Sequence, residues 1–218
     1  MYKDFRNFAR ENVSGSILDS YFKPQLIQSP VILEERKLNV SQMDVFSRLM
    51  ADRIIFLGDA IDSDVANIIQ AQLLFLENTD KGKPINLYLN TPGGSVYAGL
   101  GIYDTMKFIK SPVYTTCTSL AASMGAILLS GGEKGHRGAL KHSRVMIHQP
   151  SGGMRGTFAD MKIDLEEMTN LKNELCEILS LETGKPFEEV EKDWDRDNWF
   201  KSDEALEYGL IDGVITKR

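Results

Sequence analysis

Residues 85–95 read Ile-Asn-Leu-Tyr-Leu-Asn-Thr-Pro-Gly-Gly-Ser, and this stretch decides the fold class. The run Ile85–Leu89 alternates apolar and more polar side chains, which is typical of a β-strand. A helical pattern follows from about Gly94 to Phe108, directly after the glycine pair. A strand that passes through a short glycine turn into a helix is the repeating unit of α/β proteins.

The same unit recurs on both sides of this stretch. Strand-like runs occupy Arg53–Leu57 and Val113–Cys117, and helical patterns run from about Asp62 to Glu77 and from about Ser123 to Leu129. The order βαβαβα favours parallel strands covered by helices. The first of these helices, capped by Asp62 or Ser63, is expected to place an apolar face in the core, made of Val65, Ile68, Ile69 and Leu73.

Length and composition indicate one globular domain, expected over residues 31–218. The 218 residues are 42% apolar and 26% charged with a net charge of −6, which excludes collagen-like and wholly disordered chains. Residues 1–30 show no steady periodicity and predict an arm that is mobile or ordered only against a partner. The acidic balance and the lack of a long basic run argue against a nucleic-acid partner.

Membrane, secretion and metal-site signals are also missing. The longest apolar stretches, such as Ala121–Leu129, fall short of the roughly 18–20 residues that a membrane helix needs. No apolar signal core occurs near the start, so we expect a cytoplasmic protein without membrane association. Cys117 and Cys176 have no neighbouring Cys or His at ligand spacing, which predicts buried free thiols and no metal site.

A longer helix is predicted from Thr157 to Leu181. Thr157 stands three residues before Asp160, a weak capping signal, and Gly184 and Pro186 follow the helix. One stripe of this helix is apolar, which predicts that a partner subunit covers it; the alternative is that the stripe packs on the chain's own sheet. The stripe contains Phe158, Met161, Leu165, Met168, Leu171, Leu175 and Ile178.

Two strand-to-helix junctions could carry chemistry, because helix N-termini there present free amides to a ligand. The first contains Gly93-Gly94, which is equally compatible with a plain turn. In the second, Ser123 is flanked by small residues and resembles a nucleophile elbow, although Ala121 stands where the strict pattern has glycine. The alternative for this second junction is a buried helix start rich in small residues.

A serine nucleophile needs a base, and the chain offers three histidines. His148 follows a strand-like run and precedes a glycine-rich loop, whereas His136 and His142 lie in a stretch, residues 131–144, that is expected to be a solvated loop. A structural role for His148 stays open. Three acids, Asp193, Asp195 and Asp197, are candidates for the third member of a triad, or they form only a charged turn.

Several motifs in one order resemble the Clp protease family of serine peptidases, from about Pro30 to the C-terminus. The matching segments are Asp44–Leu49, Asn90–Gly94, Gly101–Met106, Ala121–Ala126, Arg144–Pro150, Asp195–Asp197 and Glu207–Asp212. The resemblance implies Ser123 as nucleophile, His148 as general base and Asp197 as orienting acid. It also implies an oxyanion hole formed by the backbone amides of Gly94 and Met124.

The resemblance further implies an α/β fold of the crotonase-like type, a spiral of βαβ units with a long handle helix. Family members form two stacked seven-membered rings and cleave unfolded polypeptide, so a homo-oligomer, a tetradecamer, is expected here. An AAA+ ATPase unfoldase of the ClpX, ClpA or ClpC type feeds this polypeptide into the chamber. Residues 1–30 correspond to a region that is a short propeptide plus axial loops in many members. No cofactor is expected on this chain, since the unfoldase uses the ATP and no phosphate-binding loop motif is present.

The same resemblance assigns two surfaces. Residues from about 151 to 183 match the handle through which the rings meet, with Gly152, Gly153, Phe158, Met161 and Leu165 at the interface. Tyr88 matches one of two tyrosines in the unfoldase docking site, and Asn86 replaces the other. Two alternatives remain: a non-catalytic ring subunit of this family, and a crotonase-type acyl-CoA enzyme.

Overall fold

The computed structural model describes residues 31–36, 39–153 and 155–217. They belong to two compact units, residues 1–48 and 49–218. In the first unit, β1 (Val31–Arg36) and β2 (Asn39–Asp44) form an antiparallel pair. The helix that follows, α3 (Val45–Ala51), contains the boundary between the two units. The arm expected at residues 1–30 lies outside the described residues, and a single domain over 31–218 stays a prediction.

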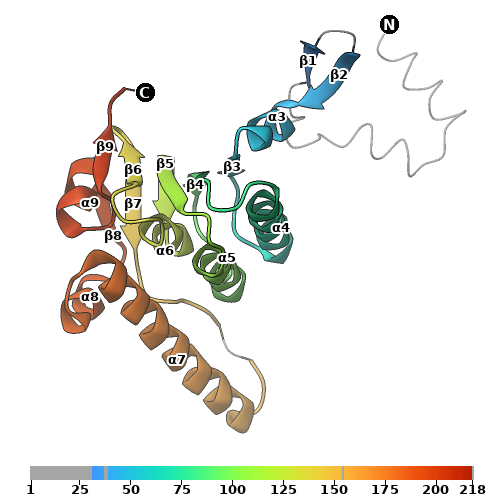
Figure 1. Cartoon of the computed structure of the whole chain (residues 1–218). Helices are drawn as coiled ribbons and strands as arrows, with labels where there is room; N and C mark the ends of the chain where they lie inside the picture. The colour runs from blue at the N-terminus through green and yellow to red at the C-terminus, as the bar shows by residue number, and fades with distance from the viewer. Residues whose placement is uncertain (1–30, 37–38, 154, 218) are drawn as a thin grey trace, which may run out of the picture. The chain divides into compact units, whose positions relative to one another are not determined.

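The second unit is built on a parallel sheet, as the βαβ alternation predicts (Figure 1). Its main strands follow the order β3-β4-β5-β6-β9 and pair in parallel throughout. Their bounds are β3 Ile54–Leu57, β4 Ile85–Thr91, β5 Val113–Ala122, β6 Arg137–Leu140 and β9 Gly213–Ile215. This confirms the α/β class.

Strand β5 is longer than predicted and serves two neighbours. Its middle, from Thr115 to Cys117, pairs with β6, while its end, from Leu120 to Ala122, pairs in parallel with β7 (Arg144–Ile147). Strand β8 (Asn198–Lys201) then pairs antiparallel with β7. The sheet therefore forks at the end of β5.

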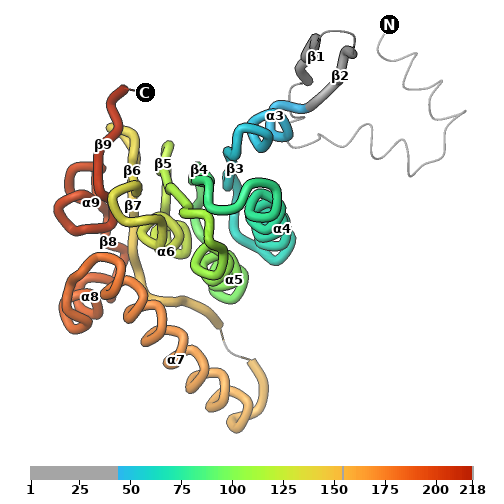
Figure 2. Tube along the Cα trace, viewed as in Figure 1, coloured from blue at the N-terminus to red at the C-terminus, as the bar shows by residue number. Residues whose placement is uncertain are grey.

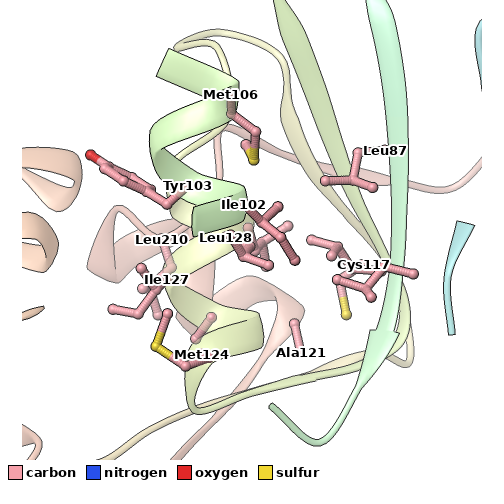
Figure 3. Packing of buried hydrophobic residues seen from close by; sticks show 14 of the residues in the cluster. Leu87, Ile102, Tyr103, Met106, Cys117, Ala121, Met124, Ile127, Leu128 and Leu210 are labelled. Carbon is pink, nitrogen blue, oxygen red and sulfur yellow. The ribbon is translucent and has the colours of Figure 1, made fainter. Parts of the chain in front are cut away.

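Helices α4 (Ser63–Thr79), α5 (Val96–Phe108) and α6 (Met124–Ser130) pack side by side against the sheet (Figure 1). Figure 3 shows side chains of α5 and α6, among them Ile102 and Leu128, meeting Leu87 and Cys117 of the strands in one apolar core. Parallel strands covered by helices bury their side chains in this way.

The expected face of the first of these helices, α4, is partly wrong. Ile69 and Leu73 are buried and Val65 is half-buried, but Ile68 is 57% exposed. Consecutive residues of a helix point about 100° apart, so Ile68 and Ile69 cannot both face the centre of the core. Ala66 and Leu76 complete the buried face instead.

The expectation of a solvated loop over residues 131–144 is also wrong in part. The segment contains β6, and Arg137 at its start is only 6% exposed. The Arg137 guanidinium pairs with Asp212, at 2.8 Å from Nε to Oδ2, and donates to the carbonyl of Glu182 at 2.8 Å. Burial would raise the pKa of Asp212, but hydrogen bonds from Arg137 and its charge outweigh burial and lower it. This partner makes a buried arginine tolerable, which local sequence does not reveal.

Helix α7 (Phe158–Thr183) is the long helix predicted from Thr157, and Thr157 forms a capping box with Asp160. Its C-terminal half lies near α8 (Phe187–Asp193), and its N-terminal half extends away from the sheet (Figures 1 and 2). The chain ends with α9 (Ser202–Tyr208) and β9.

The apolar stripe of α7 is divided between two environments. Leu175 is buried in the chain's own core, together with Cys176 and Leu179. Phe158 and Leu165, in contrast, are 81% and 55% exposed. The prediction that a partner subunit covers the whole stripe is therefore wrong for Leu175. The C-terminal half of α7 packs on the chain's own core, and only the N-terminal half extends beyond it.

Both cysteines are free and buried, as expected. Burial raises the pKa of Cys117, and it raises that of Cys176 to about 11. At neutral pH both thiols are therefore protonated, which is the inert form.

Candidate active site

The register of three neighbouring strands brings their ends together at the fork. Ala122, the last residue of β5, is opposite Met146 of β7, and Ile147 of β7 is opposite Asn198, the first residue of β8. The residues just beyond these ends are Ser123, His148 and Asp197. Three positions far apart in sequence thus meet at one edge of the sheet, where ligands of α/β proteins bind.

Ser123 occupies a sharp turn between β5 and α6. Its backbone angles, φ 54° and ψ −122°, lie outside the regions that residues other than glycine ordinarily adopt. Its amide donates to the carbonyl of Met146 at 2.8 Å, which fixes the turn to the neighbouring strand. Such backbone strain costs of order 1–3 kcal/mol and is typical of functional turns. The geometry is that of the nucleophile elbow that the sequence suggested despite Ala121.

His148 lies between a hydroxyl and a carboxylate. Its Nε2 is 2.9 Å from Oγ of Ser123, and its Nδ1 is 2.9 Å from Oδ1 of Asp197. A carboxylate only accepts hydrogen bonds, so the network assigns the proton of a neutral imidazole to Nδ1 and leaves Nε2 as the acceptor for the serine hydroxyl. The three residues form one continuous hydrogen-bonded chain.

The structure separates the three acids that the sequence could not distinguish. Asp193 accepts a hydrogen bond from the Tyr208 hydroxyl at 3.0 Å, and burial together with this bond raises the pKa of Tyr208. Asp195 accepts from the Gln149 side chain at 3.1 Å. Only Asp197 contacts His148.

The Gly93-Gly94 turn is fixed against the serine turn by close backbone contacts. A Cβ on Gly93 would lie 2.6 Å from the carbonyl oxygen of Ala122, and a Cβ on Gly94 would lie 2.2 Å from that of Ile61. Both glycines have positive φ, 88° and 153°. The glycine pair is therefore required by close packing within the chain.

This packing brings the glycine turn against the first residue of α6. The Cβ position of Gly93 would lie only 3.0 Å from the Met124 amide nitrogen. Met124 is the first residue of α6, where an amide has no acceptor within its own helix. Two hydrogen bonds hold the glycine turn to Ile61. The Ile61 amide donates to the Gly93 carbonyl at 2.8 Å, and the Ser95 amide donates to the Ile61 carbonyl at 2.7 Å. Gly94 therefore belongs to a turn that is bound to Ile61 on one side and packs against the start of α6 on the other.

A small apolar cavity of about 20 Å³ adjoins Ser123 and His148. The sequence analysis missed its wall because the wall combines side chains of α5, α6, α7 and the turn after α8, which no local pattern connects. Pro150 and Trp194 are examples.

Gln149 was also missed: its amide donates to the Trp194 carbonyl at 2.7 Å, and its side chain donates to the Asp195 carbonyl at 2.9 Å. These bonds hold the acidic turn beside His148.

The residues assigned to other surfaces lie away from this site. Tyr88 is half-buried and stacks on Phe56 at 5.4 Å between ring centroids, beside a cavity of about 700 Å³ that Tyr114 and His136 also line. His142 is exposed and takes no part in the serine site.

The predicted handle residues are all exposed: Gly152, Gly153, Phe158, Met161 and Leu165. Among the described residues, no group of His, Cys, Asp and Glu could hold a metal ion. In the same part of the chain, no helix is both long and apolar enough to cross a membrane.

Comparison with known proteins gives consistent matches. The family model described as Clp protease matches residues 36–218. A protein named "ATP-dependent Clp protease proteolytic subunit" from Porphyromonas gingivalis is 56% identical over 217 residues, 98% of each chain. A Bacteroides fragilis protein of the same name is 55% identical over 99% of each chain. "ATP-dependent Clp protease proteolytic subunit 2" of Parasynechococcus marenigrum is 54% identical over 87% of this chain and 96% of its own.

Proposed function

Because this chain belongs to the Clp protease family, and is therefore a peptidase, we propose that it cleaves peptide bonds by nucleophilic attack of Ser123. The observation that carries the proposal is the hydrogen-bonded chain from Ser123 through His148 to Asp197. This arrangement favours a catalytic subunit over the non-catalytic alternative. The acyl-CoA alternative has no support from the relatives, whose names describe proteolytic subunits.

The proposed reaction has two stages. As Oγ of Ser123 bonds to the substrate carbonyl carbon, Nε2 of His148 takes the hydroxyl proton; it then gives that proton to the leaving amine when the C–N bond breaks. Water, deprotonated by the same nitrogen, then attacks the acyl ester. The C–O bond to Ser123 breaks, Nε2 returns the proton to Oγ, and the acid product is released. The Asp197 carboxylate holds the imidazole in the required tautomer and stabilises its cationic form.

The oxyanion of each tetrahedral intermediate needs donors that are in place before the reaction. We assign this role to the amides of Gly94 and Met124. The assignment is supported by the close packing of Gly93, the neighbour of Gly94, against Cβ of Ser123 and the amide nitrogen of Met124. Each such donor is worth roughly 3–4 kcal/mol of transition-state stabilisation. Close packing at Gly93 and Gly94 explains why this turn cannot carry larger residues.

A serine-directed fluorophosphonate probe tests this assignment directly. We expect one adduct per chain, mapped by mass spectrometry to Ser123, because only this hydroxyl donates to a histidine among the described residues. Ser95 and Ser119 are the internal controls: Ser95 caps α5 by accepting the Ala98 amide hydrogen, and Ser119 is exposed on β5. An adduct on either of them would reject Ser123 as the nucleophile.

The relatives' names describe subunits of ATP-dependent proteases, so this chain is part of a Clp protease complex that works with an ATPase. We propose a homo-oligomer of two seven-membered rings in the cytoplasm, which encloses the serine sites and receives unfolded polypeptide from an AAA+ unfoldase of the ClpX, ClpA or ClpC type. The aromatic cavity around Phe56 and Tyr88 is the docking site in this proposal.

The exposed half of α7 supports a ring-to-ring contact in this proposal. Leu165→Lys is expected to shift the particle to single rings or smaller species in analytical ultracentrifugation, with unchanged circular dichroism. Burying a leucine is worth roughly 1.5–3 kcal/mol, and ring symmetry repeats the loss. Peptidase activity should fall with assembly.

Ile163→Lys is the matched control for this variant. Ile163 is 65% exposed and points about 200° away from Leu165 around the helix, so the double ring should persist. If Leu165→Lys sediments as the parental particle, this residue does not hold the rings together.

A further inference from the structure

The small cavity beside Ser123 has one wall residue much larger than the others. The cavity has a volume of about 20 Å³, roughly the room for one water-sized group. Trp194 is the largest side chain of its wall and is 1% exposed. The other lining residues are Val96, Ser123, Met124, Ile127, Ile147, His148, Pro150, Leu175 and Leu179.

The position of the cavity indicates which part of a substrate would enter it. In the proposed reaction the attacked carbonyl lies between Oγ of Ser123 and the amides of Gly94 and Met124. The substrate residue that contributes this carbonyl is here called the acyl-side residue. Its side chain is attached to the Cα atom, which is bonded directly to the carbonyl carbon. Since Ser123 and Met124 both line the cavity, the acyl-side side chain is the group placed to fill it.

The wall cannot easily retreat to admit a large group. Ile127, Leu175 and Leu179 are 3%, 3% and 1% exposed and belong to the main apolar core, as does Trp194. Such interiors are close-packed, so enlarging the cavity would require several core side chains to move together. The volume of the empty cavity is therefore a guide to the side chain that it accepts.

Backbone hydrogen bonds fix Trp194 in this wall. Its amide donates to the Val190 carbonyl at 3.0 Å, and its carbonyl accepts from the Gln149 amide at 2.7 Å. Gln149 follows His148 directly in the chain, so this hydrogen bond fixes the Trp194 backbone close to the proposed general base. Because these bonds are made by the backbone, a smaller side chain at position 194 should enlarge the cavity and leave the surrounding backbone in place.

The indole N–H is the only buried side-chain donor or acceptor in the described part of the chain that lacks a hydrogen-bond partner. A buried tryptophan usually finds an acceptor for this group. Here the side chain contributes bulk, and a smaller apolar residue would break no hydrogen bond. Substitution of Trp194 therefore leaves no orphaned acceptor behind.

From these observations we propose that Trp194 is a specificity-determining residue that limits the acyl-side residue of the substrate to short side chains. This inference rests on the proposed function, because the cavity has this meaning only if Ser123 is the nucleophile. Alanine is the best acyl-side residue for the parent enzyme, and leucine and phenylalanine are progressively worse. Removing the indole ring reverses this order.

The test measures kcat/KM for one peptide series that carries a fluorogenic leaving group and differs only in having alanine, leucine or phenylalanine as the acyl-side residue. The assembled parent enzyme is compared with Trp194→Leu and with the milder Trp194→Phe. Ratios within one preparation cancel differences in the amount of folded enzyme. Trp199→Leu is the matched control, since Trp199 is 52% exposed and does not line the cavity.

We expect the parent and Trp199→Leu to favour alanine over phenylalanine by about ten-fold or more, which is the scale on which an apolar pocket discriminates size. Trp194→Leu should raise the phenylalanine-to-alanine ratio by about ten- to a hundred-fold. Trp194→Phe should raise the leucine-to-alanine ratio in the same direction, so the comparison survives if the leucine variant does not fold.

A parent enzyme that cleaves the phenylalanine peptide fastest would overturn the proposal, and so would unchanged ratios in the folded Trp194 variants. Failure of the proposed function has a different signature. In that case the parent and Trp199→Leu would cleave none of the three peptides, and the fluorophosphonate would not label Ser123.

Discussion

Replacing Ser123 by alanine is expected to lower kcat for a short fluorogenic peptide by about 10⁶-fold, the scale measured when a triad serine is removed from a serine protease. Alanine lacks the oxygen that forms the acyl ester, so the covalent route is lost. The fold should persist, because the substitution removes one half-buried hydroxyl and leaves in place the hydrogen bond that the backbone amide of residue 123 donates to the Met146 carbonyl.

Ser119→Ala is the matched control for this experiment. Ser119 lies four residues earlier on β5, and its side chain is exposed. Its variant should retain parental kcat and parental sedimentation, measured side by side with Ser123→Ala. If Ser123→Ala kept more than a small fraction of parental kcat, another nucleophile would have to be sought.

The second large effect is expected for Asp197→Asn, with a loss in kcat of about 10⁴-fold. An asparagine side chain fits the same space, but its amide can donate to Nδ1 and stabilise the wrong imidazole tautomer, in which Nε2 carries the proton. That nitrogen could then no longer accept the Ser123 proton. The loss should appear in kcat with assembly unchanged, measured by steady-state kinetics and ultracentrifugation.

Asp195→Asn provides the comparison, since Asp195 bonds to Gln149 instead of His148. It changes the same charge two residues away, so a simple effect of net charge would appear in both variants. We expect Asp195→Asn to keep most of the parental rate. If Asp195→Asn or Asp193→Asn were the crippling change, the orienting acid would be misassigned.

Features that depend on neighbours along the chain could be predicted from the sequence. The alternation of strands and helices, the capping box at Thr157 and the free state of Cys117 and Cys176 all follow from local periodicity, capping chemistry and residue spacing. Ser123 became a candidate because small residues flank it at a helix start, and His148 because it follows a strand-like run at a strand end. The structure brings these two side chains into hydrogen-bond contact.

Contacts between distant segments could not be predicted from the pattern alone. Asp193, Asp195 and Asp197 are chemically identical within one turn, and only the pairing of β8 with β7 directs Asp197 to His148. The resemblance to the family had selected Asp197, but charge and spacing had not. Likewise, Arg137 could be recognised as buried only once Asp212, far along the chain, was known to be its partner.

The sequence by itself thus determined the α/β class, the order of the serine, histidine and acidic candidates along the chain, and the long amphipathic helix. Each of these is encoded in patterns that span a single helix or strand and its ends. The tertiary structure decided which acid meets the histidine, where the stripe of α7 passes from the core to an exposed surface, and how little space Trp194 leaves beside Ser123. These depend on strand register and on packing among α5, α6, α7 and the turn after α8. Such contacts form only when the whole unit folds, and no local pattern specifies them.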